Sequence, residues 1–283
     1  MRVKLVVLLL VVLSCLRAFS QSPPANQGMR GETIRVEPAR QVREDVDLWP
    51  LIARPKSDAE LRVNATLTRL NKEFVKSLRD CDGDIIEFEK QAGQSGDPTK
   101  DDWGRSIKVT MRGPRFLSMV ASDDFYCGGA HPDEDLTVLV FDMKTGAQVD
   151  WSTLVRKSAG ASSAKNVLGD AEGATHPILL PELQAIYAAA EEDYCKDYFE
   201  DDRPFFLWPN AESGTLIAEV AGLPHIAAPC KNELKLTIEQ ARNLGFDELL
   251  LQAIEEAHRI AAAHPKAKPV QTQSAPAAPT GPD

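Results

Sequence analysis

The 283-residue chain carries 42 acidic and 32 basic side chains, which gives it a formal net charge of −10. Such an acidic surface disfavours nucleic acid and anionic lipid as partners and suits basic proteins or cations, although solubility alone also explains it. The length allows one large domain or two small ones with a hydrophobic core.

The first twenty residues have the pattern of an export signal. An apolar run of about a dozen residues, too short to span a bilayer, leads to Ala18-Phe19-Ser20, which favours cleavage before Gln21. One alternative is a lipobox ending at Cys15; another, a buried N-terminal helix, would place Arg17 in a core. Removal of residues 1–20 takes away three positive charges and changes the net charge from −10 to −13. We expect a periplasmic or secreted protein, or a lipoprotein anchored through Cys15, without a transmembrane span in the mature chain.

Four cysteines follow the export signal: Cys81, Cys127, Cys195 and Cys230. No two lie within a few residues of each other, so the usual zinc-ligand spacings are absent. An even number in an exported chain favours two disulfides. Of the three possible pairings we favour Cys81–Cys127 with Cys195–Cys230, because each closes the shortest loop within one half of the chain. The alternative is that one pair stays reduced and buried.

Composition separates two flexible ends from a central domain. Residues 21–46 are rich in Pro, Gly, Gln and charge without apolar periodicity, which predicts a flexible linker. Residues 263–283 contain five prolines among Ala, Lys, Gln and Thr, which predicts a disordered Pro/Ala-rich tail. The folded domain is therefore expected over residues 47–262.

The first helix of this domain is expected to begin at a capping box formed by Ser57 and Glu60 and to end near Asp80. Apolar residues recur along one of its faces, at Val63, Leu67, Leu70, Phe74 and Leu78. Asn64-Ala65-Thr66 matches the glycosylation sequon, but its place within a helix favours a chance match.

Strand patterns follow this helix. Alternating apolar residues at 107–111 and apolar runs at 116–121 and 136–141 are separated by short turns, which favours an antiparallel meander. A helix is then expected from Pro181, strands at 205–208, 216–220 and 234–236, and two final helices that begin near Thr237 and Asp247. The predicted fold class is α+β, an antiparallel β-sheet packed against helices at its ends.

Two adjacent motifs resemble a known family. Tyr126-Cys-Gly-Gly-Ala-His-Pro132 is followed by Val140-Phe-Asp-Met-Lys-Thr-Gly146. The combination resembles the bacterial domain of unknown function found at the C-terminus of the lysozyme-sensing anti-sigma factor RsiV and beside the polysaccharide deacetylase PdaC. The match covers about residues 48–245 and includes Asn64 and Asn71 on the predicted helix, but Cys230 stands where many relatives have glycine. No sigma-factor-binding or deacetylase segment is recognisable, so the resemblance implies neither activity.

The densest group of potential ligands follows the first of these motifs. His131, Asp133, Glu134 and Asp135 stand together in the sequence, five residues after Tyr126. A histidine among carboxylates can bind a cation or act as a general base. Tyr126, His131, Asp133 and Asp135 are therefore the candidate binding residues.

The alternative, which we favour, assigns the same corner to chain geometry. Gly128, Gly129 and Pro132 mark a tight turn between strands, and Gly146 marks the next turn. The remaining histidines are scattered, and the sequence contains no Gly-x-Ser-x-Gly elbow, phosphate-binding glycine fingerprint or calcium-loop spacing. The sequence therefore predicts no metal, no cofactor and no catalytic residue.

Three classes of function remain open. The favoured one is an exported cell-envelope binding or sensor module without catalysis, whose ligand is a cell-wall glycan such as peptidoglycan or a basic protein such as lysozyme. The second is a metal-assisted hydrolase of cell-wall sugar or peptide centred on His131. The third is a purely structural envelope protein.

Overall fold

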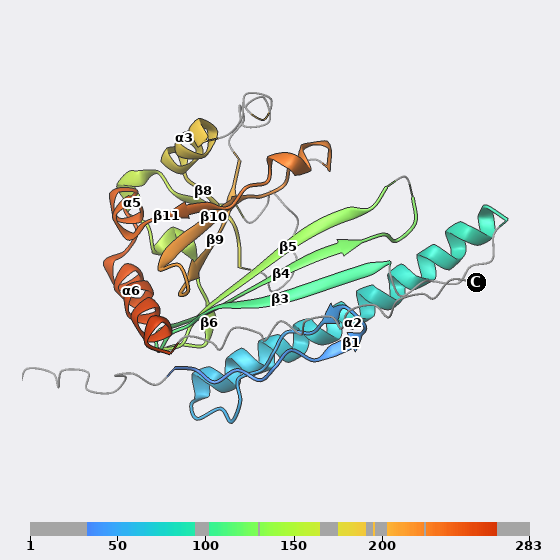
Figure 1. Ribbon diagram of the computed structural model, residues 1–283, viewed down its shortest axis with the longest axis horizontal. Coiled ribbons are helices and arrows are strands. Elements are labelled where there is room, and N and C mark those ends of the chain that lie inside the picture. Colours follow the sequence, from blue (N-terminus) through green and yellow to red (C-terminus); the bar gives the residue numbers. More distant parts are fainter. Residues whose placement is uncertain are drawn as a thin grey trace, which may run out of the picture. The chain divides into compact units, whose positions relative to one another are not determined.

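The structure, a computed structural model, describes residues 33–93, 102–129, 131–164, 175–190, 195, 203–223 and 225–264. The predicted export signal, the alternative anchor Cys15 and residues 265–283 of the predicted tail lie outside these residues. The compact unit described below begins at Ile34. Figure 1 shows its helices and strands.

A six-stranded sheet forms the centre of this unit, in the order β1-β2-β3-β4-β5-β6. Its strands are β1 (Gln41–Arg43), β2 (Val46–Asp47), β3 (Trp103–Arg112), β4 (Phe116–Phe125), β5 (Asp133–Asp142) and β6 (Ala147–Gln148). Neighbours are antiparallel except for β2 and β3, which are parallel. The long strands β3, β4 and β5 form the predicted meander, because turns of a few residues can join only antiparallel neighbours.

Strand β4 is buried on both faces over most of its length, and β5 is buried on both faces at residues 138–141. Successive side chains point to opposite faces of a strand, so Leu117 and Met119 pack with the core beneath helix α2 (Asp58–Gln91). Phe116 and Val120, on the opposite face, belong to a second and larger core. The sheet is therefore the middle layer of the unit.

Helix α2 covers one face of this sheet (Figure 1). It begins at the predicted capping box, in which Ser57 and Glu60 each accept a hydrogen bond from the other's backbone N–H. The predicted end near Asp80 is wrong, because the helix continues to Gln91. Cys81 and Ile85 extend the buried face by another turn, and this burial outweighs the helix penalty of Gly83, about 1 kcal/mol.

Residues 35–40 and 48–53 form an extended pair, here called the N-terminal ribbon, joined by a bridge between Val36 and Ile52. Two asparagines two turns apart on α2 hold the ribbon. The Asn71 amide accepts a hydrogen bond from Trp49 N at 2.8 Å and donates one to Trp49 O at 3.0 Å. Asn64 does the same with Ile52, at 2.8 and 3.0 Å. Each amide side chain thus replaces one residue of a missing neighbouring strand.

Residues 34–46, which the composition assigns to a flexible linker, are part of the folded unit. Ile34 and Val36 are buried with α2, β1 lies in this range, and β2 begins at its last residue. The sequence shows no apolar periodicity here because only a few side chains of the segment reach the core.

A second sheet packs on the face opposite α2, in the order β11-β10-β9-β8-β7. Its strands are β7 (Ser162–Ser163), β8 (Ile178–Leu179), β9 (Phe205–Asn210), β10 (Thr215–Val220) and β11 (Leu234–Leu236). Strand β9 lies against β3, β4 and β5. A β-bulge between Val109 and Met111 lets Thr110 O accept a hydrogen bond from Ala211 N at 2.8 Å, which joins the two sheets.

The remaining helices and the disulfides complete the unit. The helices are α3 (Pro181–Ala190), α5 (Ile238–Asn243) and α6 (Glu248–Ala263), and α6 packs against the larger core. Both disulfides are present with the favoured pairing, Cys81–Cys127 and Cys195–Cys230. The α+β class is confirmed, with strands divided between two sheets. In the described ranges, none of the helices combines the length and apolarity needed to cross a membrane.

Candidate functional site

The predicted corner connects β4 to β5 and is called here the β4–β5 corner, residues Tyr126–Asp135. Gly128 and Gly129 have φ values of +85° and +111°, in the region that glycine adopts without strain. Tyr126 Oη donates a hydrogen bond to Gly129 O at 3.1 Å. The glycines therefore shape the chain at this turn.

A disulfide fixes the β4–β5 corner to the C-terminal half of α2. Cys127, which directly follows Tyr126, forms a disulfide with Cys81. A Cβ atom at Gly128 would lie 3.1 Å from Phe88 Cβ, so the corner and the helix are in close contact. Phe88 remains 43% exposed beside this contact. The corner is thus a rigid edge with an exposed aromatic side chain next to it.

The predicted ligands in the corner do not converge. His131 is exposed, and its Nδ1 lies 2.8 Å from Pro132 O. Asp133 and Asp135 each accept a hydrogen bond from the N–H of the following residue, at 2.9 and 2.8 Å. Glu134 points to the opposite face of β5, because side chains alternate along a strand. Among the described residues, no three His, Cys, Asp or Glu side chains are grouped so that they could hold a metal ion.

A buried ion pair on the α2 side of the sheet was not recognised from the sequence. The Arg105 guanidinium lies 3.3 Å from Asp123 Oδ1, and their side chains are only 6% and 4% exposed. Trp103 Nε1 donates a further hydrogen bond to Asp123 at 2.8 Å. The guanidinium carbon also lies 4.0 Å from the centre of the Phe74 ring and 5.2 Å from that of Trp49.

Burial dominates the ionisation of this pair. Burial lowers the pKa of Arg105, against the opposing charge of Asp123, and burial raises the pKa of Asp123, against the charge of Arg105. A buried, paired arginine between aromatic rings joins β3, β4 and α2 but offers no group to a ligand. We therefore assign the pair a structural role. Side chains directly opposite each other on paired strands share a face of the sheet. This rule identifies Arg105 and Asp123 as neighbours, but only when the register of β3 with β4 is known.

A second titratable cluster lies on the opposite face of the sheet. Burial, followed by the charge of Glu233, raises the pKa of Glu219 on β10 to about 7; Lys231 opposes this shift and Glu134 adds to it. Lys231 also forms an ion pair with Glu134 on β5, with an N–O distance of 3.7 Å. Lys231 thus interacts with both Glu134 and Glu219 where the second sheet meets β5.

Charge accumulates at the corner end of β4 and β5. Asp124 lies directly opposite Glu134 in the antiparallel register, and Asp123 lies opposite Asp135. Like charges in opposite positions destabilise a sheet. On one face Arg105 offsets the repulsion, and on the other Lys231 does so through its ion pair with Glu134. This end of the sheet therefore concentrates negative charge.

The other histidines within the described residues do not form a site. His258 on α6 packs against the β9–β10 turn, where its Nδ1 lies 2.9 Å from Ala211 O. A Cβ atom at Gly214 would lie 2.8 Å from the His258 ring, so the histidine fills the space beside this glycine. Its position is explained by packing, in agreement with the structural interpretation of the scattered histidines.

Comparisons with known proteins show distant similarity to solved structures. No family model matches the chain, and no curated protein matches it. Among solved structures, the chain is similar to the crystal structure of a DUF3298 family protein from Pseudomonas aeruginosa PAO1, with 15% sequence identity and a TM-score of 0.33. The similarity covers 52% of this chain and 65% of that one, so it spans less than two thirds of that protein.

Proposed function

We propose that the protein is an exported binding or sensor module of the cell envelope, without catalysis, which recognises its ligand at the β4–β5 corner. The carrying observation is the disulfide between Cys81 and Cys127, which fixes this exposed edge to α2. An edge held rigidly before binding loses little conformational entropy when a ligand docks, and this is how preorganised sites gain affinity.

Two further observations support export. Two disulfides are typical of proteins that fold in an oxidising compartment such as the periplasm or the extracellular space. The first twenty residues have the pattern of a cleavable signal, with lipidation at Cys15 as the alternative. We also propose that a linker precedes the folded unit and that a Pro/Ala-rich tail follows it. The linker ends before Ile34, where the folded unit begins.

A basic protein such as lysozyme is the preferred ligand. Carboxylates meet across β4 and β5 at the corner, and Asp84 follows Cys81 on α2, where Asp82 is paired with Arg43 at 3.1 Å. Such a surface attracts cationic proteins and repels polyanions. The exposed aromatic Phe88 beside the corner adds an apolar contact of the kind that anchors protein interfaces. The resemblance of the corner sequence to the RsiV and PdaC type of domain supports the same choice.

The test compares binding of lysozyme and of peptidoglycan by the wild-type protein and by the double variant Asp133→Asn, Asp135→Asn. Asparagine keeps the local hydrogen bonds to Glu134 N and Leu136 N, because its amide oxygen also accepts. We expect lysozyme to bind and the double variant to weaken binding by roughly three- to tenfold. A double variant with Glu212→Gln and Glu255→Gln, exposed carboxylates outside the corner, is the matched control and should bind as the wild type does.

Each outcome of this test decides between the three functions. Equal loss in both double variants would show a non-specific charge effect, and no binding of either ligand would favour the structural alternative. Stoichiometric metal in the purified protein that disappears in His131→Ala would favour the hydrolase. Without such metal, the binding surface at the β4–β5 corner remains the better account.

A further inference from the structure

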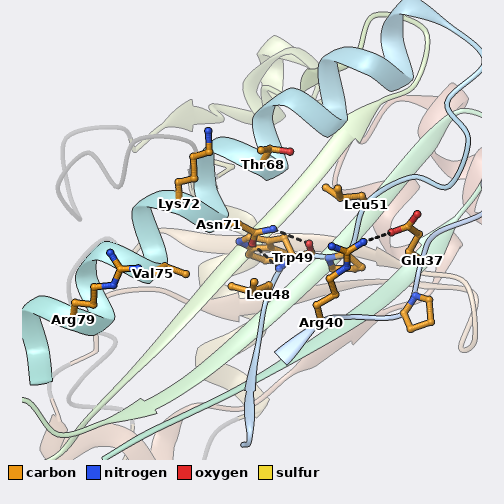
Figure 2. A pocket seen from close by; sticks show the side chains of 12 residues that line it. Glu37, Arg40, Leu48, Trp49, Leu51, Thr68, Asn71, Lys72, Val75 and Arg79 are labelled. Carbon is orange, nitrogen blue, oxygen red and sulfur yellow. Dashed lines mark hydrogen bonds and ion pairs between the residues drawn. The ribbon is translucent and has the colours of Figure 1, made fainter. Parts of the chain in front are cut away.

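A cavity of about 430 Å³ lies between α2 and the N-terminal ribbon (Figure 2). This volume is in the usual range for sites that bind small molecules. The ribbon contributes Leu48, Trp49 and Leu51 to its wall, and α2 contributes Val75. Trp49 is only 3% exposed and Arg105 lies over its ring at 5.2 Å, so it supports the wall from behind. The half-buried Leu48, Leu51 and Val75 provide the accessible apolar surface.

The cavity is built on a rigid frame. Its ribbon side is held to α2 by both hydrogen bonds of Asn71 with the Trp49 backbone. Within the ribbon, Leu48 N donates to Arg40 O at 2.7 Å and Glu37 N donates to Leu51 O at 2.8 Å, which joins its two segments. Because the backbone around the cavity is paired on both sides, the cavity does not depend on a loop that must order when a ligand binds.

The rim of the cavity carries a net positive charge, whereas the whole chain is negatively charged. Arg40, Lys72 and Arg79 line it, with Glu37 as the single carboxylate. The net charge of the chain is −10. Glu37 lies 3.6 Å from Arg40 in an exposed pair, which contributes little. Within the part of the chain that the structure describes, no ion pair joins Lys72 or Arg79 to a carboxylate. Figure 2 shows these two side chains on α2, on either side of Val75.

We propose that this cavity binds a small amphiphilic carboxylate, whose apolar body lies on Leu48, Leu51 and Val75 and whose carboxylate pairs with Lys72 and Arg79. The apolar wall alone would suit a neutral hydrophobic molecule. Lys72 and Arg79, which form no ion pair with a carboxylate among the described residues, favour an anion, because a hydrogen bond between opposite charges is stronger than one between neutral groups. Neither cation belongs to the β4–β5 corner, so this site is independent of the proposed function.

The test uses anilinonaphthalene sulfonate, an apolar anion that fluoresces when it leaves water, as the probe with the purified protein. We expect the probe to bind the wild type and octanoate to displace it, whereas the uncharged 1-octanol at the same concentration displaces it much less. The double variant Lys72→Gln, Arg79→Gln should bind both anions about tenfold more weakly. Lys76→Gln is the matched control, because Lys76 is on the same helix but pairs with Asp80 at 2.6 Å.

Unchanged probe and octanoate affinity in the double variant would overturn the proposal, as would equal displacement by octanoate and octanol. Amide chemical shifts provide a second readout, since octanoate should move signals of residues 48–51 and 68–79 in the wild type. Shifts confined to other parts of the chain would place the anion elsewhere and would equally refute the site. Thermal unfolding of each variant verifies that the charge changes leave the fold intact.

Discussion

The turn between β5 and β6 gives a sharp test of the packing between α2 and the central sheet. Gly146 has a φ of +73°, and a Cβ atom there would lie 2.4 Å from Ala59 O and 2.9 Å from Ala59 Cα. Ala59 lies in the first turn of α2, so the contact is with helix backbone and cannot be relieved by a side-chain rotation. Gly146→Ala must therefore move the start of α2 or the turn itself.

The expected loss has two parts. A non-glycine residue at positive φ costs about 1–2 kcal/mol, and forced overpacking costs about 1–3 kcal/mol more. We therefore expect Gly146→Ala to lower the free energy of unfolding by roughly 2–5 kcal/mol, measured by urea denaturation. Gly160→Ala is the control, because Gly160 has a similar φ of +68° with nothing within 4 Å of its Cβ position. Equal losses in the two variants would refute the close approach as the cause.

Two further predictions concern Glu219 and Asn71. The folded-state pKa of Glu219, about 7 against an ordinary 4.5, means that the folded protein binds this proton more tightly than the unfolded chain. Stability from Glu219 is therefore fully present below pH 4.5 and is lost as the pH rises through about 7, by at most about 3 kcal/mol. The free energy of unfolding of the wild type should fall between pH 5 and pH 8, and Glu219→Gln should make this fall smaller. An unchanged fall in the variant would contradict the assigned burial of Glu219. Asn71→Ala removes both bonds to the Trp49 backbone and should cost roughly 2–4 kcal/mol despite the better helix propensity of alanine. Ser77→Ala, at an exposed position of the same helix, is the control. If Asn71→Ala lowers the free energy of unfolding no more than this control does, water replaces the amide of Asn71.

Local signals in the sequence were sufficient for several elements. The capping box of Ser57 and Glu60 specifies where α2 begins, because both of its hydrogen bonds lie within four residues. The alternation around Val109 and the short turns identify the meander. The cysteine pairing also followed from short loops. These features depend on residues that are close in the sequence, so they can be predicted without knowledge of the fold.

Features that depend on distant partners were not predictable. The end of α2 was misplaced because Gly83 signals a break, whereas the burial of Ile85 that extends the helix depends on the tertiary structure. Asn64 matches a glycosylation sequon, yet its amide is bonded to the Ile52 backbone. The pairing of Arg105 with Asp123 needs the register of two strands. The division of the strands between two sheets likewise depends on which hydrophobic faces meet.

Hydrogen–deuterium exchange in the presence and absence of lysozyme tests the central claim, that the β4–β5 corner is the recognition edge, most directly. The account predicts slower exchange on lysozyme addition in peptides that cover residues 81–90 and 126–136, which the Cys81–Cys127 disulfide holds together. Exchange in α6, which lies against the larger core, should not change. Protection confined to other elements, or none with either lysozyme or peptidoglycan fragments, would contradict the assignment of this edge.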